Sequence, residues 1–153
     1  MQLQVISGAL VNATAVDLQT PGEASACAAS ADTTASDAGL DSVVVACPDQ
    51  SHLYAAENIF TTGAFTALWD GDGGTIRNVH VLPSYARATI FWSSNGAVLM
   101  GQVNGPPIAV IAELPASPTR LDLAASIRGG YLLSTVFDGG QGTRAYGAYV
   151  CPP

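Results

Sequence analysis

The chain has 153 residues, of which 48% are hydrophobic and 11% charged, and its formal net charge at pH 7 is -7. Length and composition predict one β-rich domain over residues 1–153, with ample apolar material for a core and no stretch long enough to insert into a membrane. With no lysine, and five arginines against twelve carboxylates, the surface repels nucleic acids and offers no amine for a Schiff base.

The N-terminal part of the chain falls into two regions. Residues 2–9 and 12–18 alternate polar and apolar side chains, which predicts two strands of a hairpin. Residues 19–41 are nearly all Ala, Ser, Thr, Asp and Gly and lack the large apolar side chains that anchor a strand or a helix. We expect this segment to be a long surface excursion, with a short helix as the alternative.

From residue 42 onward, strand signals dominate. Strands are predicted over 43–47, 52–56, 64–69, 75–82, 88–92, 97–103, 108–114, 121–127, 131–137 and 144–150. Gly- and Pro-rich turns separate them, including a hairpin turn about Ser94-Asn95-Gly96. The spacing predicts an all-β fold of antiparallel hairpins, arranged as a β-sandwich or barrel.

Residues 129–150 read GGYLLSTVFDGGQGTRAYGAYV. This stretch resembles a blade repeat of bacterial surface β-propeller proteins, in which a Gly-Tyr-Leu strand, an Asp-Gly turn and a Tyr-Gly-Ala strand follow one another. The tryptophan of that repeat is absent, and Thr135 and Val136 stand in its place. The resemblance implies partial propeller-like repeats as the alternative architecture.

Asp70 and Asp72 lie one residue apart in the Gly-rich stretch 70–74, which is also a strong turn signal. Paired carboxylates on such a loop could supply oxygen ligands to Ca²⁺, although the bidentate glutamate of an EF-hand loop is missing. The alternative is a tight turn with solvated carboxylates. No other cofactor is expected.

The three cysteines, Cys27, Cys47 and Cys151, allow at most one disulfide within the chain. Cys47 and Cys151 each end an apolar strand and precede a proline, so they are predicted as the bridged pair if a bridge forms. The alternative is three small, half-buried apolar residues.

Aromatic side chains are few, and three are candidates for contact with a glycan or a protein partner: Trp92, Tyr131 and Tyr146. Phe91 and Trp92 adjoin, so they point to opposite faces of one strand, and we expect one to be buried and the other exposed.

The residue pattern contains no catalytic motif. His52 and His80 are the only histidines, and Glu57 and Glu113 are the only glutamates in β-rich surroundings. A hydrolase that assembles its groups across the fold is the least favoured interpretation. We therefore expect a protein that is not an enzyme.

The charge-poor surface is typical of a protein that packs against neighbours or lies outside a cell. We expect a non-catalytic structural subunit of a larger assembly, such as an accessory, decoration or fibre-type protein of a bacteriophage particle. Its partners would be other protein subunits, most simply copies of itself, and its location the virion or the extracellular space. The alternative is an extracellular carbohydrate-binding module, either lectin-like or derived from a propeller.

Overall fold

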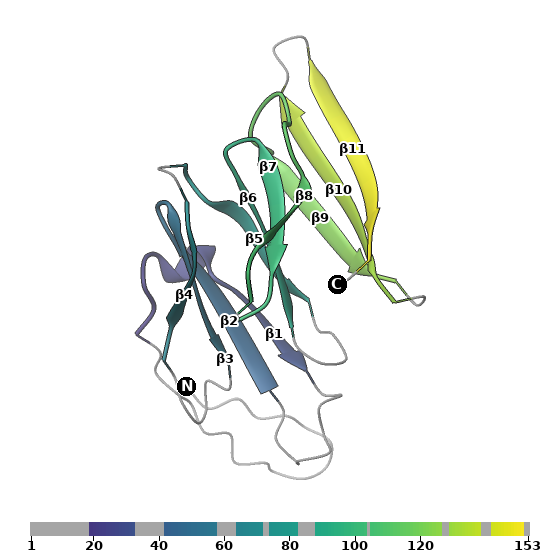
Figure 1. Ribbon diagram of the computed structural model, residues 1–153. Coiled ribbons are helices and arrows are strands. Elements are labelled where there is room, and N and C mark those ends of the chain that lie inside the picture. Colours follow the sequence, from purple (N-terminus) through teal and green to yellow (C-terminus); the bar gives the residue numbers. More distant parts are fainter. Residues whose placement is uncertain are drawn as a thin grey trace, which may run out of the picture.

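The computed structural model describes residues 19–32, 42–57, 64–71, 74–82, 88–103, 105–126, 129–138 and 142–151 (Figure 1). Within these ranges the regular elements are strands, apart from one short 3-10 turn, η1 (Ala24–Ala26). All strand pairs are antiparallel, which confirms the predicted all-β fold of antiparallel hairpins. No helix in this part of the chain is long and apolar enough to span a membrane.

The strands in chain order are β1 (Ala28–Asp32), β2 (Ser42–Asp49), β3 (His52–Glu57), β4 (Thr66–Asp70), β5 (Arg77–Leu82), β6 (Thr89–Ser94), β7 (Ala97–Gly101), β8 (Ile108–Ile111), β9 (Arg120–Ala125), β10 (Tyr131–Asp138) and β11 (Thr143–Val150). All the strands predicted between 43 and 150 are present, with ends that differ by a few residues. The strands predicted over 2–9 and 12–18 lie outside the described residues.

The strands form three sheets, each of which is an up-and-down meander. Sheet A contains β1 to β4, sheet B contains β5 to β8, and sheet C contains β9 to β11 in the order β11-β10-β9. The sheets follow one another across the molecule in that sequence (Figure 1). A meander is also the strand order of a propeller blade. The propeller resemblance of residues 129–150 nevertheless stays a prediction.

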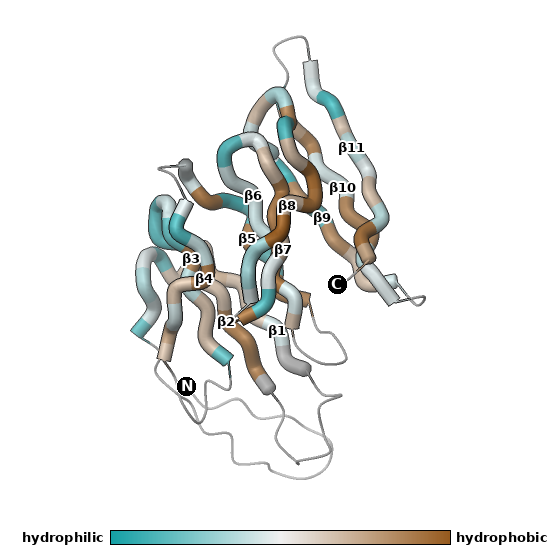
Figure 2. Tube along the Cα trace, in the orientation of Figure 1, coloured by the Kyte–Doolittle hydropathy of each residue, from teal (hydrophilic) through white to brown (hydrophobic). Residues whose placement is uncertain are grey.

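Sheet B is the central layer of the described fold. One core cluster joins it to sheet A through residues such as Leu53 and Trp92, and a second joins it to sheet C through Phe91 and Leu133. The hydrophobic stretches of β2, β7 and β8 can be followed in Figure 2. Because sheet B is covered on both faces, the described strands build a sandwich of three layers.

Strand β6 shows most clearly that the strands of the central sheet are buried on both faces. All six of its residues are buried, and the neighbours Phe91 and Trp92 are both fully inaccessible to solvent. They point to opposite faces, as expected, but the expectation that one of them is exposed is wrong. The third layer covers the face that a two-layer sandwich would leave open to water.

The predicted hairpin about Asn95-Gly96 is confirmed and joins β6 to β7. Both residues have positive φ, 47° and 71°, as the primed turns of two-residue hairpins require. A Cβ at Gly96 would lie 2.8 Å from the carbonyl oxygen of Leu114. The amide of Leu114 in turn donates to the carbonyl of Gly96 at 2.8 Å, so this turn also holds the chain that follows β8.

The excursion predicted over 19–41 contains a strand that the sequence pattern did not indicate. β1 pairs with β2 from Ala28, opposite Ala46, to Asp32, opposite Ser42. It lies close to β5 of sheet B, and Ala28 packs against the core between sheets A and B. Small side chains suit this close approach, and their small size is the reason that the strand gives no hydrophobic signal. Residues 33–41 lie outside the described residues.

Candidate interaction surface

The structure contains a disulfide, but between a different pair of cysteines from the predicted one. Cys27 and Cys47 are bonded, with their Cα atoms 4.2 Å apart, whereas Cys151 is free and exposed directly after β11. Cys27 precedes β1 and lies opposite Cys47 of β2, because the β1–β2 register pairs Ala28 with Ala46. The predicted Cys47–Cys151 bridge is therefore wrong, because the β1–β2 pairing places Cys27 beside Cys47 while Cys151 follows β11 of sheet C.

Two of the three aromatic candidates for partner or glycan contact are buried. Trp92 lies between sheets A and B, where its ring is tilted against that of Trp69. Tyr131 packs edge-on against Phe91, and its hydroxyl donates to Thr89 Oγ1 at 2.9 Å. Neither ring can meet a ligand directly. The assignment of Trp92 and Tyr131 as contact residues is wrong because sheets A and C cover the central sheet.

Tyr146, the third candidate, is 45% exposed on β11. One face of its ring stacks on Phe137, with 5.3 Å between the ring centroids and 15° between their planes. Phe137 itself is fully buried. Stacking therefore fixes the orientation of an aromatic ring that is partly open to solvent.

Only one of the two predicted Ca²⁺ ligands, Asp70, belongs to the described residues. Asp70 ends β4 and is largely exposed, and its Oδ1 lies 3.2 Å from His52 Nε2. Asp72 lies outside the described residues. Within the described ranges, no three His, Cys, Asp or Glu side chains gather in a way that could hold a metal ion. Calcium binding by Asp70 and Asp72 stays a prediction.

A hollow of about 220 Å³ lies where β6, β7 and the start of β8 meet, and it is mostly apolar. Its lining residues are Thr89, Met100, Gly101, Gln102, Gly105, Pro106 and Ile108. None of these side chains titrates near neutral pH or acts as a strong nucleophile, so they bring no acid–base pair to the hollow.

The most distinctive surface among the described residues is the outer face of sheet C, the face turned away from sheet B. Leu132 of β10 and Tyr149 of β11 lie directly opposite each other there and are 54% and 50% exposed. Ala124 of β9 stands opposite Leu132 on its other side. The hydroxyl of Tyr149 donates to the carbonyl of Gly129 at 2.7 Å, so the ring is held in place.

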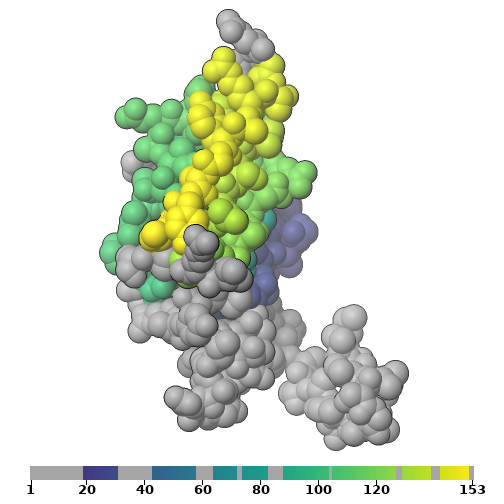
Figure 3. All heavy atoms as spheres, turned by 90° about the vertical axis from the view of Figure 1, so that its right-hand side faces the viewer, coloured from purple at the N-terminus to yellow at the C-terminus, as the bar shows by residue number. Residues whose placement is uncertain are grey.

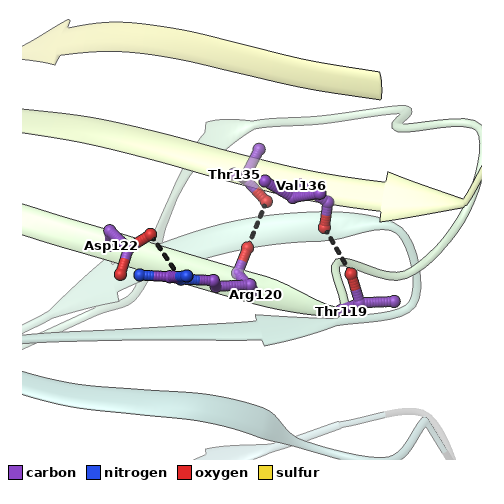
Figure 4. A network of polar contacts seen from close by, with 5 residues as sticks. All are labelled: Thr119, Arg120, Asp122, Thr135 and Val136. Carbon is purple, nitrogen blue, oxygen red and sulfur yellow. Dashed lines mark hydrogen bonds and ion pairs between the residues drawn. The ribbon is translucent and has the colours of Figure 1, made fainter. Parts of the chain in front are cut away.

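Two of the three charged side chains on this outer face, Arg120 and Asp122, neutralise each other, while Asp138 of β10 accepts a hydrogen bond from Thr143 Oγ1 at 3.2 Å. Arg120 Nε lies 2.7 Å from Asp122 Oδ2, two positions along β9, and both side chains are exposed. Thr135 Oγ1 donates to the carbonyl of Arg120 at 3.1 Å, and Thr119 Oγ1 donates to that of Val136 at 3.0 Å (Figure 4). These contacts pin the start of β9 to β10. An exposed pair of this kind adds little stability.

The outer edge of sheet C is strand β11. β11 has no further strand partner among the described residues, and six of its eight residues are exposed. The third strands of the other two sheets, β3 and β7, are each flanked by a fourth strand, and three of six residues in β3 and four of five in β7 are buried. Figure 3 shows β11, in yellow, along the surface that faces the viewer. A free edge of this length is a ready template for pairing with another strand.

Sequence reasoning selected Tyr146, on the inner side of β11, but missed Leu132 and Tyr149 on the outer face of sheet C. A usable signal was present, because Leu132 shares the outer phase of β10 with Ser134 and Asp138. A large apolar residue on the polar side of an alternating strand is a candidate contact residue.

Comparison of the chain with protein-family models, with curated proteins and with solved structures finds no match.

Proposed function

We propose that this protein is a non-catalytic structural subunit of a larger assembly, of the accessory, decoration or fibre type found on bacteriophage particles. The observation that carries the proposal is sheet C, which exposes Leu132 and Tyr149 on its outer face and whose edge strand β11 has no further strand partner among the described residues. Contiguous exposed apolar side chains are typical of surfaces that meet another protein.

The electrostatics of sheet C support contact with other subunits. Arg120 is paired with Asp122 on the outer face, and the other charged residues of the three strands, Asp138 of β10 and Arg144 of β11, have opposite signs. A surface with so few unpaired charges loses little hydration when it is buried, and a neighbouring copy meets little like-charge repulsion there. The large negative charge of the chain as a whole is carried elsewhere.

The disulfide supports a location in the virion or outside the cell. Cys27 and Cys47 are bonded, and structural disulfides persist in oxidising surroundings but are rare in the cytosol. A bridge that ties β1 to β2 also suits a subunit that must stay folded outside a cell.

A carbohydrate-binding module is the second candidate, and Tyr146 is the residue that favours it. Its ring is held by stacking on Phe137 and remains 45% exposed, as an aromatic platform for a sugar must be. This candidate predicts that a glycan array gives a signal that Tyr146→Ala abolishes. A glycan array without signal would exclude carbohydrate binding as the function.

The experiment that tests the structural proposal is light scattering of the purified protein across a concentration series, with and without EDTA. We expect a defined oligomer whose share rises with concentration. A monomer throughout would overturn the proposal. Dissociation by EDTA would assign a metal, with Asp70 and Asp72 as first candidates, to the contact.

A further inference from the structure

We propose that β11 pairs antiparallel with β11 of a second copy of this chain, with Gly147 facing Gly147 of the partner subunit across a two-fold axis. This inference rests on the proposed function and names the first contact of the assembly. It extends sheet C of one copy into sheet C of the other through backbone hydrogen bonds, the mode of recognition known as strand addition.

The length of β11 favours a copy of the same strand as its partner. β11 has eight residues, whereas the other described sheet edges have six in β5 and β9, five in β1 and β4, and four in β8. Among these edges, only another β11 matches it over its full length. Two-fold dimers, in which the same patch serves both subunits, are the commonest form of oligomer.

Gly147 marks the centre of the proposed pair. Nothing described within the chain requires glycine there, because its φ is not positive and an added Cβ would meet only the carbonyl oxygen of Leu133, at an ordinary 3.7 Å. A glycine inside a strand weakens that strand, and it often marks the close approach of another backbone. Such an approach is possible at the outer edge of β11, which no other described strand covers.

Side-chain sizes along β11 match this register. With Gly147 opposite its counterpart, Tyr149 faces the partner's Ala145 on the outer side of the sheet. On the inner side, Tyr146 faces the partner's Ala148. Each large ring therefore stands opposite a small residue, so no two rings compete for the same space across the pair.

The charges along β11 also permit this register. Arg144 stands opposite Val150 of the partner subunit, and the partner's Arg144 lies six positions further along the paired strands. At 3.3 Å per residue, the two Arg144 side chains therefore start about 20 Å apart. No like charges meet across the pair.

The expected area of the contact predicts a weak dimer. Two paired strands of this length bury less than the roughly 1,600 Å² of a standard interface, so the dimer should form only as concentration rises. The two-fold axis keeps the Leu132–Tyr149 surfaces of both copies on one face of the joined sheet. That face stays available for further contacts in the assembly.

The test is cysteine cross-linking in a Cys151→Ser background, which removes the free exposed thiol. Gly147→Cys is compared with Ala145→Cys, since both positions are exposed on the outer face of β11. In the proposed register the two cysteines introduced by Gly147→Cys face each other, whereas the two introduced by Ala145→Cys lie roughly 13 Å apart along the strands. Each protein is oxidised with glutathione disulfide, and the covalent dimer is measured without reductant.

We expect Gly147→Cys to form the covalent dimer at least tenfold faster than Ala145→Cys. Equal rates, or a faster rate for Ala145→Cys, would overturn the proposed register. If light scattering shows the Cys151→Ser protein to be an oligomer but neither variant cross-links, β11 is not the contact and the proposed function stands. If that protein is monomeric at every concentration, the proposed function fails as well.

Discussion

Phe91 and Trp92 are neighbours on β6, and both rings are completely buried, one in each of the two cores of the molecule. Phe91 meets Tyr131 of sheet C edge-on, and Trp92 meets Trp69 of sheet A. Two consecutive residues of one strand thus tie the outer sheets to the central one. The stability of the three-layer fold should depend strongly on this pair.

Replacing either ring by alanine should therefore destabilise the folded protein strongly. Phe91→Ala and Trp92→Ala each leave a large void and are expected to lower the free energy of unfolding by about 3–5 kcal/mol. Leu132→Ala, on the exposed face of sheet C, should change it by less than about 0.5 kcal/mol. Denaturant titration of the three variants checks this. A loss below about 1 kcal/mol for Phe91→Ala would mean that sheet C does not pack on sheet B as described.

The hydroxyl of Tyr131 makes a buried hydrogen bond to Thr89 at 2.9 Å, whereas that of Tyr149 bonds the Gly129 carbonyl at the surface. Tyr131→Phe leaves the Thr89 hydroxyl buried without its partner and should lower the free energy of unfolding by about 1–2 kcal/mol. Tyr149→Phe is the matched control, because water can replace an exposed partner. Equal effects in thermal or chemical unfolding would contradict this difference.

The assignment of the cysteines predicts how many thiols react with an alkylating reagent. The unreduced protein in denaturant should gain one alkyl group, at Cys151, and the reduced protein should gain three. Opening the bridge by Cys27→Ser with Cys47→Ser should lower the free energy of unfolding by about 3 kcal/mol, since the bridge closes a loop of about twenty residues. Cys151→Ser should leave stability unchanged. Peptide mapping that joins Cys151 to either other cysteine would refute the assignment.

Gly96 and Gly129 both have positive φ, 71° and 72°, but only Gly96 is crowded. A Cβ at Gly96 would lie 2.8 Å from the Leu114 carbonyl, while nothing lies within 4 Å of one at Gly129. Gly129→Ala should therefore lower the free energy of unfolding only by the roughly 1–2 kcal/mol that a left-handed conformation costs an L-residue. Gly96→Ala should lower it clearly more. Comparing the two unfolding midpoints tests this, and an equal loss would mean that the turn and the Leu114 segment do not approach as described.

The positions of the strands from residue 43 onward could be predicted from the sequence because hydrophobic runs bounded by Gly or Pro are local signals. Asn95-Gly96 is the clearest case, since the turn type needs those residues. Pro48 was expected to end its strand, yet β2 continues to Asp49. The proline is tolerated because β1 reaches only as far as Ala46 on that side of β2.

The features that could not be predicted depend on contacts between distant segments. The bridge between Cys27 and Cys47 follows from the β1–β2 register, and β1 itself is built from residues too small to give a signal. Burial of Trp92 and Tyr131 depends on the third layer, which no local pattern reveals. Of the three aromatic candidates only Tyr146 is exposed, because it lies on the edge strand β11, where part of the ring stays in water.

Amide hydrogen exchange of the native chain, below and above the concentration at which it associates, tests most directly whether sheet C is the assembly surface. Association through β11 predicts that peptides covering Thr143–Val150 become protected at high concentration, while those covering Ile108–Ile111 of β8, an exposed edge in sheet B, do not change. Protection of β8 instead, or unchanged exchange over β11 while the mass rises, would contradict a contact through sheet C.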